Sequence, residues 1–351
     1  MKVFTGDSIG LLKGICLEKK RVVSTWRNLN RQKAIEKLSW GNVNEQKEIL
    51  VATSDKTVEI IDVEDGNVVS TLKDYTHNGN FISIEGIESY IVTASSDGVI
   101  RYVNYAPDES KETCKKNFNA SVSCVHTSPA NKSIIAIGGR EFDLHLYDLT
   151  SDKPLFKAKN ISNDSVDLRC PVWVNRLIFL NDSGYHVAVG TGYHEIRRYD
   201  TRAQRKPVQR VNFGDLPITA ISKLSEDKII AGNSGGYMRT VEFRSKSKVL
   251  LTTRFRGSLG SIRAIAKHPE LPYVVSAGLD RHLSLYSQAN GRPLERIYLK
   301  QRLNDILFSS EGRLLVESNG GPEELLQKTF EEEEREELWN SMEKLVDAAQ
   351  A

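Results

Sequence analysis

The sequence is poor in cysteine and methionine and has no long apolar run. Its 351 residues include four cysteines and three methionines. The cysteines, Cys16, Cys114, Cys124 and Cys170, are scattered without metal-ligand spacing, so we expect reduced and mostly buried thiols. No stretch approaches the ~18 apolar residues of a membrane span, and turn residues interrupt positions 1–14, where a signal peptide needs an apolar run. These absences predict a soluble, intracellular protein with no membrane partner.

The motifs of the common enzyme classes are missing as well. No two of the seven histidines stand at zinc-ligand spacing, and there is neither a nucleophile elbow nor a phosphate-binding glycine loop. Asp55, Asp97 and Asp280 each fall in a hairpin turn, where aspartate commonly accepts bonds from nearby backbone amides. His268 precedes Pro269 in another turn, so we assign it a structural role. We therefore predict a binding protein with no catalytic residue, metal or cofactor, and regard a propeller hydrolase as a remote alternative.

One short pattern is repeated seven times along the chain. Each copy is an apolar strand, a small or polar turn and a second alternating strand, and the copies lie at 2–15, 49–63, 92–103, 134–149, 186–200, 228–243 and 273–287. Equivalent turn residues of the second to seventh copies are Asp55, Asp97, Arg140, Tyr193, Gly235 and Asp280. Their spacings are 42, 43, 53, 42 and 45 residues, close to the ~40–45 residues of a four-stranded propeller blade.

The two ends of the chain supply the parts of one incomplete repeat. The first copy lacks a preceding strand, whereas LNDILF at 303–308 is a strand without a hairpin of its own. Joining them completes a ring of seven and removes the exposed edges that promote aggregation. The sequence thus predicts an all-β, seven-bladed propeller over residues 1–318, closed by strands from both termini. An open solenoid or a pair of sandwiches is the alternative.

The net charge of +2 conceals an uneven distribution. From position 322 onward there are three basic and ten acidic residues, a net charge of −7, which leaves 45 basic and 36 acidic residues, a net charge of +9, in 1–321. We expect 319–351 to be an acidic tail, helical or partly disordered. An amphipathic helix there would place Leu338, Trp339 and Met342 on one face, to bind a partner or to pack on the propeller. A basic propeller suits a negatively charged partner such as RNA, although ordinary surface charge balanced by the tail explains the numbers equally well.

Two segments carry more charged residues than a scaffold needs. The interval of 53 residues contains an insertion near 157–170, and a long connection on a ring of short ones often carries recognition. The second segment, 193–206, has five basic residues; Arg197 and Arg198 are strand neighbours, so one of them is free to pair with Asp200 or Glu195. We predict that both segments form one docking face for phosphate or an acidic protein, against the alternative of a solvated outer strand. Its candidate residues are Lys157, Lys159, Asn160, Asp164, Asp167, Arg169, Tyr193, His194 and Arg197.

These segments also carry a resemblance to a known family. The chain resembles WD-repeat proteins in which the Trp-Asp dipeptide has been replaced, as at Tyr147-Asp148, Tyr199-Asp200 and Ile61-Asp62. More narrowly, it resembles the nucleolar WD-repeat family of ribosome-assembly factors, the Nop-seven-associated protein of fungi and its animal counterparts. The matching stretches are 156–173, 190–200, 260–283, 297–309 and 337–345. The insertion with its following Gly-Tyr-His is the most specific of these, because closing a propeller does not require it.

The resemblance implies a non-enzymatic scaffold in biogenesis of the large (60S) ribosomal subunit, in the nucleus and nucleolus. The implied partners are pre-60S assembly proteins, a nucleolar AAA-type ATPase that releases the factor, an RNA helicase of the nuclear exosome, and ribosomal RNA. The alternative function is a substrate receptor of a cullin-type ubiquitin ligase. Tyr199-Asp200-Thr201-Arg202 differs by one residue type from the Trp-Asp-x-Arg box of such receptors.

Overall fold

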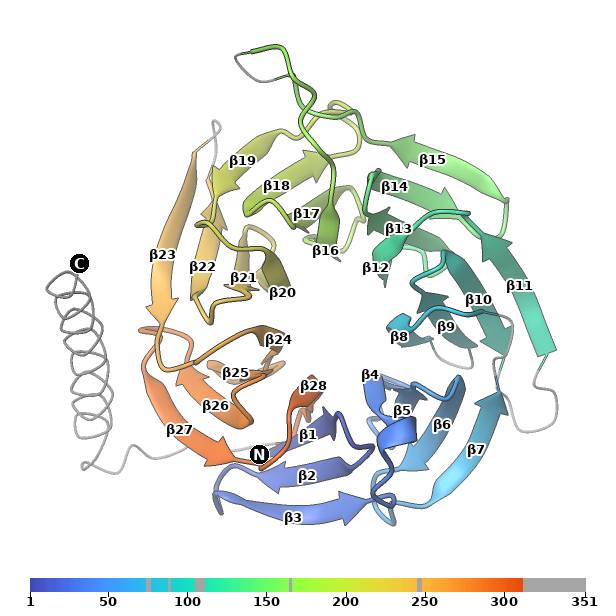
Figure 1. Ribbon diagram of the computed structural model, residues 1–351, viewed down its shortest axis with the longest axis vertical. Helices are drawn as coiled ribbons and strands as arrows, with labels where there is room; N and C mark the ends of the chain where they lie inside the picture. The colour runs from blue at the N-terminus through green and yellow to red at the C-terminus, as the bar shows by residue number, and fades with distance from the viewer. Residues whose placement is uncertain (74–76, 88–89, 105–110, 164–165, 245–247, 312–351) are drawn as a thin grey trace, which may run out of the picture.

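Seven antiparallel sheets of four strands stand around a common axis (Figure 1). The computed structural model describes residues 1–73, 77–87, 90–104, 111–163, 166–244 and 248–311. The predicted seven-bladed propeller is therefore confirmed, whereas the domain boundary at 318 and the tail residues Leu338, Trp339 and Met342 lie outside the described residues. No helix in the described part is long and apolar enough to cross a bilayer.

The first blade, called the closing blade here, is built from both ends of the chain. Its strands, from the axis outward, are β28 (Leu303–Phe308), β1 (Lys2–Asp7), β2 (Leu12–Cys16) and β3 (Arg21–Trp26). A short 3₁₀ helix, Arg31–Lys33, leads to the second blade, β4 (Ile35–Trp40), β5 (Glu48–Thr53), β6 (Thr57–Asp62) and β7 (Val68–Lys73). The third blade contains β8 (Phe81–Ile87), β9 (Tyr90–Ser95), β10 (Val99–Asn104) and β11 (Lys111–Asn117).

The remaining blades follow the same order from the axis to the rim. The fourth contains β12 (Val122–Thr127), β13 (Ile134–Gly139), β14 (Phe142–Asp148) and β15 (Lys153–Lys157), and the fifth contains β16 (Val174–Phe179), β17 (His186–Thr191), β18 (Glu195–Asp200) and β19 (Gln209–Asn212). The sixth contains β20 (Ile218–Ser225), β21 (Lys228–Asn233), β22 (Met238–Phe243) and β23 (Val249–Phe255), and the seventh contains β24 (Ile262–Lys267), β25 (Tyr273–Gly278), β26 (His282–Ser287) and β27 (Pro293–Tyr298).

Burial explains why the second strand of each blade is the most apolar. Five of the six residues of β5 are buried, and all six residues of β25 are, because neighbouring blades cover both faces of these strands. In the outer strand β7, by contrast, five of six residues are exposed. The core is therefore a series of apolar layers between blades, which a single repeat could not form.

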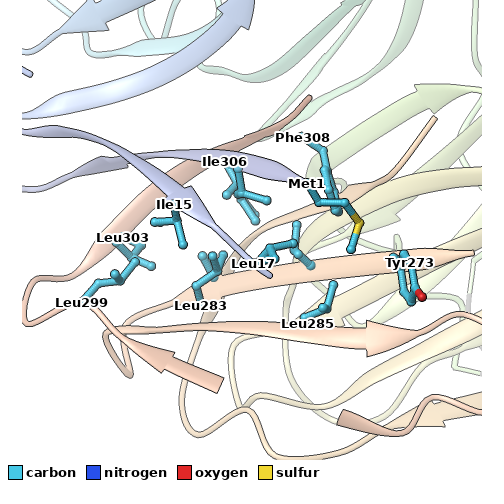
Figure 2. Packing of buried hydrophobic residues seen from close by; sticks show 14 residues of the cluster. Met1, Ile15, Leu17, Tyr273, Leu283, Leu285, Leu299, Leu303, Ile306 and Phe308 are labelled. Atoms are coloured by element: carbon cyan, nitrogen blue, oxygen red, sulfur yellow. The ribbon is translucent and has the colours of Figure 1, made fainter. Parts of the chain in front are cut away.

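The closing blade joins the ends of the chain as predicted. Val3 of β1 pairs with Phe308 of β28, and Thr5 pairs with Ile306, in an antiparallel ladder. Apolar residues of this blade then pack against the seventh blade in one cluster (Figure 2). The cluster includes Met1, Ile15, Leu17, Leu303, Ile306 and Phe308 from the closing blade and Tyr273, Leu283 and Leu285 from the seventh. Residues from both termini thus share one core.

Each innermost strand contains a β-bulge near its start. The register with the second strand skips one residue in every blade, namely Asn304, Glu36, Ile82, Ser123, Asn175, Thr219 and Arg263 in blade order. Some of these side chains reach the next blade: the Asn304 Nδ2 donates to the Ile35 carbonyl oxygen at 2.7 Å, and Asn175 does the same to Ile218 at 2.5 Å. At these two bulges the side chain thus reaches the neighbouring blade and links adjacent blades around the axis.

Candidate functional site

The predicted insertion connects β15 of the fourth blade to β16 of the fifth and extends outward from the ring (Figure 1). Its own polar residues hold its conformation. The Asn160 Nδ2 donates to the Cys170 carbonyl oxygen at 2.6 Å, and the Asn163 Nδ2 donates to the Asp167 Oδ1 at 2.8 Å. Asn160 and Asp167 are thus engaged in internal bonds, while the candidate residue Asp164 lies outside the described residues.

The end of the insertion is fixed to the hairpin turn of the fourth blade. The Glu141 amide donates to the Val172 carbonyl oxygen at 2.8 Å, and an Arg169 Nη2 lies 3.1 Å from the Glu141 Oε2. This ion pair is exposed on both sides, so it contributes little to stability. Arg140 forms a β-bridge with Trp173, and its guanidinium carbon lies 5.7 Å from the Trp173 ring centroid.

The turn of the fifth blade also contacts this tryptophan. The Gly192 amide donates to the Trp173 carbonyl oxygen at 2.8 Å, and the Tyr193 ring meets the indole edge-to-face with centroids 6.1 Å apart. A Cβ atom at position 192 would lie 2.1 Å from the Trp173 Cε3, so glycine is needed here for a close approach. The structure therefore brings together the two segments, 156–173 and 190–200, that the sequence singled out.

A group of exposed cations lies beside the insertion at the rim between the fourth and fifth blades. We call Lys157, Lys159, Arg205 and Lys206 the basic rim patch. The Lys159 amide donates to the Arg205 carbonyl oxygen at 2.9 Å, and the Arg205 Nε donates to the Lys157 carbonyl oxygen at 2.7 Å. The Lys206 Nζ donates to the Ser162 Oγ at 3.1 Å. Within the described residues none of these four cations has a carboxylate at ion-pair distance.

The patch affects the titration of a histidine beside it. Burial lowers the pKa of His145, and the positive charges of Lys157 and Arg205 lower this pKa further, while Asp143 opposes them. Lys157 and Arg205 therefore disfavour the protonated form of His145. Arg205 and Lys206 were not among the nine candidate residues. The run of basic residues at 193–206 pointed to them, but nothing in the sequence shows that the connection between β18 and β19 folds back onto the insertion.

Two other candidate residues, Arg197 and His194, lie in the fifth blade and are buried or half-buried. Arg197 is only 4% exposed, and its Nη2 lies 2.8 Å from the Glu195 Oε2, so it faces the interior. Its neighbour Arg198 points away, pairing with Asp227 at 3.2 Å. His194 occupies a left-handed turn position with φ of 55° and is half-buried. We therefore leave Arg197 out of the surface proposed below.

The residues at the two ends of the Tyr199-Asp200-Thr201-Arg202 box, on which the cullin-ligase alternative rests, differ in burial. Tyr199 is fully buried, whereas Arg202 is exposed, with its Nε 3.6 Å from the Asp200 Oδ1 and its guanidinium over the Tyr185 ring. Elsewhere, the described residues hold no group of three or more histidine, cysteine, aspartate or glutamate side chains arranged to bind a metal ion. Burial raises the pKa of the Cys124 thiol to about 12, which leaves it protonated at neutral pH.

Comparison with known proteins decides the family. The chain is 33% identical over 349 residues to WD repeat-containing protein 74 of Bos taurus, covering 97% of this chain and 89% of that protein. The chain belongs to this family. A more distant relative is Ribosome biogenesis protein nsa1 of Schizosaccharomyces pombe, 26% identical over 392 aligned residues that cover 99% of this chain and 97% of that protein. The resemblance noted from the sequence to the WD-repeat family of fungal and animal ribosome-assembly factors is thereby confirmed.

Two further matches concern the repeat and the fold of this WD-repeat family. The family model of the WD domain, G-beta repeat, matches residues 248–287, within the sixth and seventh blades. The β-propeller domain of Cps50 (Swd1) from Myceliophteria thermophila superimposes with a TM-score of 0.64. This match covers 77% of the chain and 90% of that domain at 16% identity, so it bears on the fold alone.

Proposed function

We propose that the protein is a non-enzymatic scaffold in biogenesis of the large (60S) ribosomal subunit and docks on nucleolar pre-ribosomal particles. One observation carries this proposal: a relative named as a ribosome biogenesis protein aligns with 99% of the chain and with 97% of its own length. The alignment spans nearly the full length of both proteins, so the proposal does not rest on a single shared repeat. A closed ring of stacked blades also offers a rigid surface that suits a scaffold.

The docking surface that we propose is the basic rim patch with the adjoining insertion. Lys157 and Lys159 are exposed and unpaired with carboxylates in the described residues, so a phosphate can approach them without breaking an existing ion pair. Val166 and Leu168 of the insertion are 70% and 64% exposed. These apolar side chains would contribute contact area to a protein partner beside the phosphate contacts. Tyr193, 37% exposed over Trp173, adds an aromatic side chain to the same surface.

The partners in this proposal are pre-60S assembly proteins, ribosomal RNA, an RNA helicase of the nuclear exosome and a nucleolar AAA-type ATPase. The ATPase would remove the protein from the particle, and the site of action would be the nucleus and nucleolus. Inactivating the ATPase is then expected to leave the protein on large particles in a sedimentation gradient. A distribution that does not change on ATPase inactivation contradicts this release step but not the scaffold role.

Purification of the tagged protein tests the function itself. Associated proteins are identified by mass spectrometry and associated RNA is sized by hybridisation. We expect large-subunit precursor RNA together with assembly proteins. Recovery of a cullin-ligase adaptor without precursor RNA would instead support the substrate-receptor alternative.

A charge reversal tests the docking surface. The double variant Lys157→Glu and Lys159→Glu should lower recovery of precursor particles about tenfold or more, because it replaces attraction to phosphate with repulsion. The matched control, Lys19→Glu and Lys132→Glu, makes the same charge change at exposed positions away from the patch. Equal recovery for the two double variants would rule out the patch as the docking surface, and far-ultraviolet circular dichroism checks that both fold.

A further inference from the structure

The axis of the ring carries a second group of cations, separate from the rim. The residue directly after each bulge occupies an equivalent register position in its innermost strand. These seven residues are Asp305, Lys37, Ser83, Cys124, Arg176, Ala220 and Ala264 in blade order. Since the innermost strands are neighbours around the ring, the seven positions form one layer about the axis. Arg263, the bulge residue of the seventh blade, lies one position before this layer.

Few carboxylates of the described residues lie close enough to the cations of this layer to form ion pairs with them. The Lys37 Nζ lies 3.8 Å from the Asp305 Oδ2, beyond hydrogen-bond distance. That carboxylate already accepts the Leu38 amide at 3.0 Å and the Ile306 amide at 3.1 Å. Glu36, the other nearby acid, accepts the Phe81 amide at 2.6 Å. Both carboxylates are therefore already engaged in hydrogen bonds from backbone amides.

Arg176 is the least matched of these cations. It is half-buried, and its hydrogen bond from Nη1 goes to the neutral Asn175 carbonyl oxygen at 2.8 Å. In the described residues no carboxylate lies at ion-pair distance from it. Most of the five N–H donors of this half-buried guanidinium are therefore not bound by acceptors of the described residues and are free for another partner.

These charges act on one another across the axis. The Asp305 carboxylate raises the pKa of Lys37, yet burial and the Arg176 and Arg263 charges lower the pKa below its usual value. Burial lowers the pKa of Arg176 as well, with Arg263 adding to the effect and Asp305 opposing it. Three cations from the second, fifth and seventh blades therefore share one electrostatic environment, and an anion between them would relieve their repulsion.

We propose that the axial cluster, Lys37, Arg176 and Arg263, binds a small phosphate-type oxyanion. A guanidinium presents paired N–H groups that match phosphate oxygens, and an ammonium adds a third donor. Arg263 is exposed and the Lys37 side chain keeps 22% of its surface accessible, so a small ion can reach the cluster from solvent. A nucleic-acid strand needs an exposed row of cations, whereas two of these three are half-buried. The ligand class is therefore a free anion such as inorganic phosphate or pyrophosphate.

The test is the thermal stability of the whole protein with increasing inorganic phosphate or pyrophosphate at constant ionic strength. We expect a saturable rise in Tm of about 2 °C or more in wild type. Arg176→Gln should abolish this rise, and Arg210→Gln, the same change at an exposed position of β19, should retain it. A wild-type Tm that does not respond, or a response that survives Arg176→Gln, overturns the proposal.

A second measurement separates loss of binding from loss of folding. In phosphate-free buffer the Tm of Arg176→Gln should equal or exceed that of wild type, because the variant no longer holds an unmatched charge. Lys37→Met provides an independent variant and should weaken the phosphate response at least several-fold. An unchanged phosphate response in Lys37→Met contradicts the proposed cluster. Titration calorimetry with inorganic phosphate gives the same comparison without heating.

Discussion

At the hairpin between the second and third strands of every blade, one residue takes a left-handed backbone conformation. These residues are Gly10, Lys56, Gly98, Glu141, His194, Gly236 and Arg281, with φ between 53° and 89°. Four of them have side chains, so their cost in strain must be offset by the bonds of the turn. In the third blade the left-handed residue is Gly98, and the neighbouring Asp97 shows the bonds that such a turn can make: its Oδ2 accepts the Asn78 amide at 2.9 Å and the Gly79 amide at 3.3 Å, and the Ser95 hydroxyl donates to its Oδ1.

Asp97 should therefore make stability depend on pH. Burial raises the pKa of Asp97, but the bonds from Ser95, Asn78 and Gly79 outweigh it and hold the pKa at about 2. Because this folded pKa lies below the unfolded value near ~4, the stabilisation is complete above about pH 4 and is lost as the pH falls through about 2. Asp97→Ala should cost about 1 kcal/mol at pH 7 in urea unfolding, and less at pH 2.5.

The matched control is Asp182→Ala. The Asp182 side chain is 89% exposed, and among the described residues its one ion pair is with Lys223, at 3.4 Å. Its removal should change the free energy of unfolding by less than about 0.5 kcal/mol at either pH. If Asp97→Ala lowers the free energy of unfolding by the same amount at pH 7 and pH 2.5, the assignment of a depressed pKa to Asp97 is wrong.

At the scale of elements, the insertion is positioned by the turns of two blades. Trp173 contacts both the Arg140 guanidinium and the Tyr193 ring, and its carbonyl oxygen accepts a hydrogen bond from the Gly192 amide. The sequence predicted that the insertion and the 193–206 segment share a surface, because the insertion is a long connection and both segments are rich in charged residues. It could not predict the contact itself, since Trp173 and Gly192 belong to turns whose approach depends on how adjacent blades pack.

Replacing Gly192 with alanine tests this contact. The new Cβ would overlap the Trp173 ring, whose Cε3 would be 2.1 Å away, so the indole must move. We expect Gly192→Ala to lower the free energy of unfolding by about 1–3 kcal/mol. Tryptic cleavage after Arg169 should be faster, because the insertion is held less firmly.

Gly14→Ala serves as the control for this prediction. Its Cβ would meet the Ser24 Oγ at 2.3 Å, the end of a side chain that can rotate away. Cleavage after Arg169 should match wild type in this variant. If Gly192→Ala is also cleaved at the wild-type rate, the Trp173 contact does not hold the insertion.

At the scale of the molecule, one blade carries the closure of the ring. The closing blade pairs β28 with β1 and packs on the seventh blade through residues drawn from both termini. Leu303 is fully buried in this cluster. Loss of packing at this blade should therefore weaken the whole ring, because closure is shared by all seven blades.

Leu303→Ala should lower the free energy of unfolding by about 2–5 kcal/mol. Val69→Ala is the control, because Val69 is 60% exposed on the outer strand β7 and should change stability by less than about 0.5 kcal/mol. Both are measured by urea unfolding followed by tryptophan fluorescence. Equal stability of the two variants would mean that the last strand does not hold the ring closed.

The sequence alone determined the number of blades, the positions of their repeated hairpins and the joining of the two ends. These follow from the alternation of apolar residues and from the spacing of turns, which are local properties repeated along the chain. The candidate docking segments were also visible, because an insertion stands out against a regular period.

Only the tertiary structure decided which charges gather and which are buried. Arg205 reaches Lys157 from 48 residues away, and Lys37 and Arg176 occupy equivalent positions about the axis although they belong to the second and fifth blades. Neither arrangement is local: each depends on a turn or a bulge that places a side chain, and on the stacking of separate blades. Strand alternation predicts on which of two sheet faces a side chain lies. The packing of the ring determines which residues this side chain contacts.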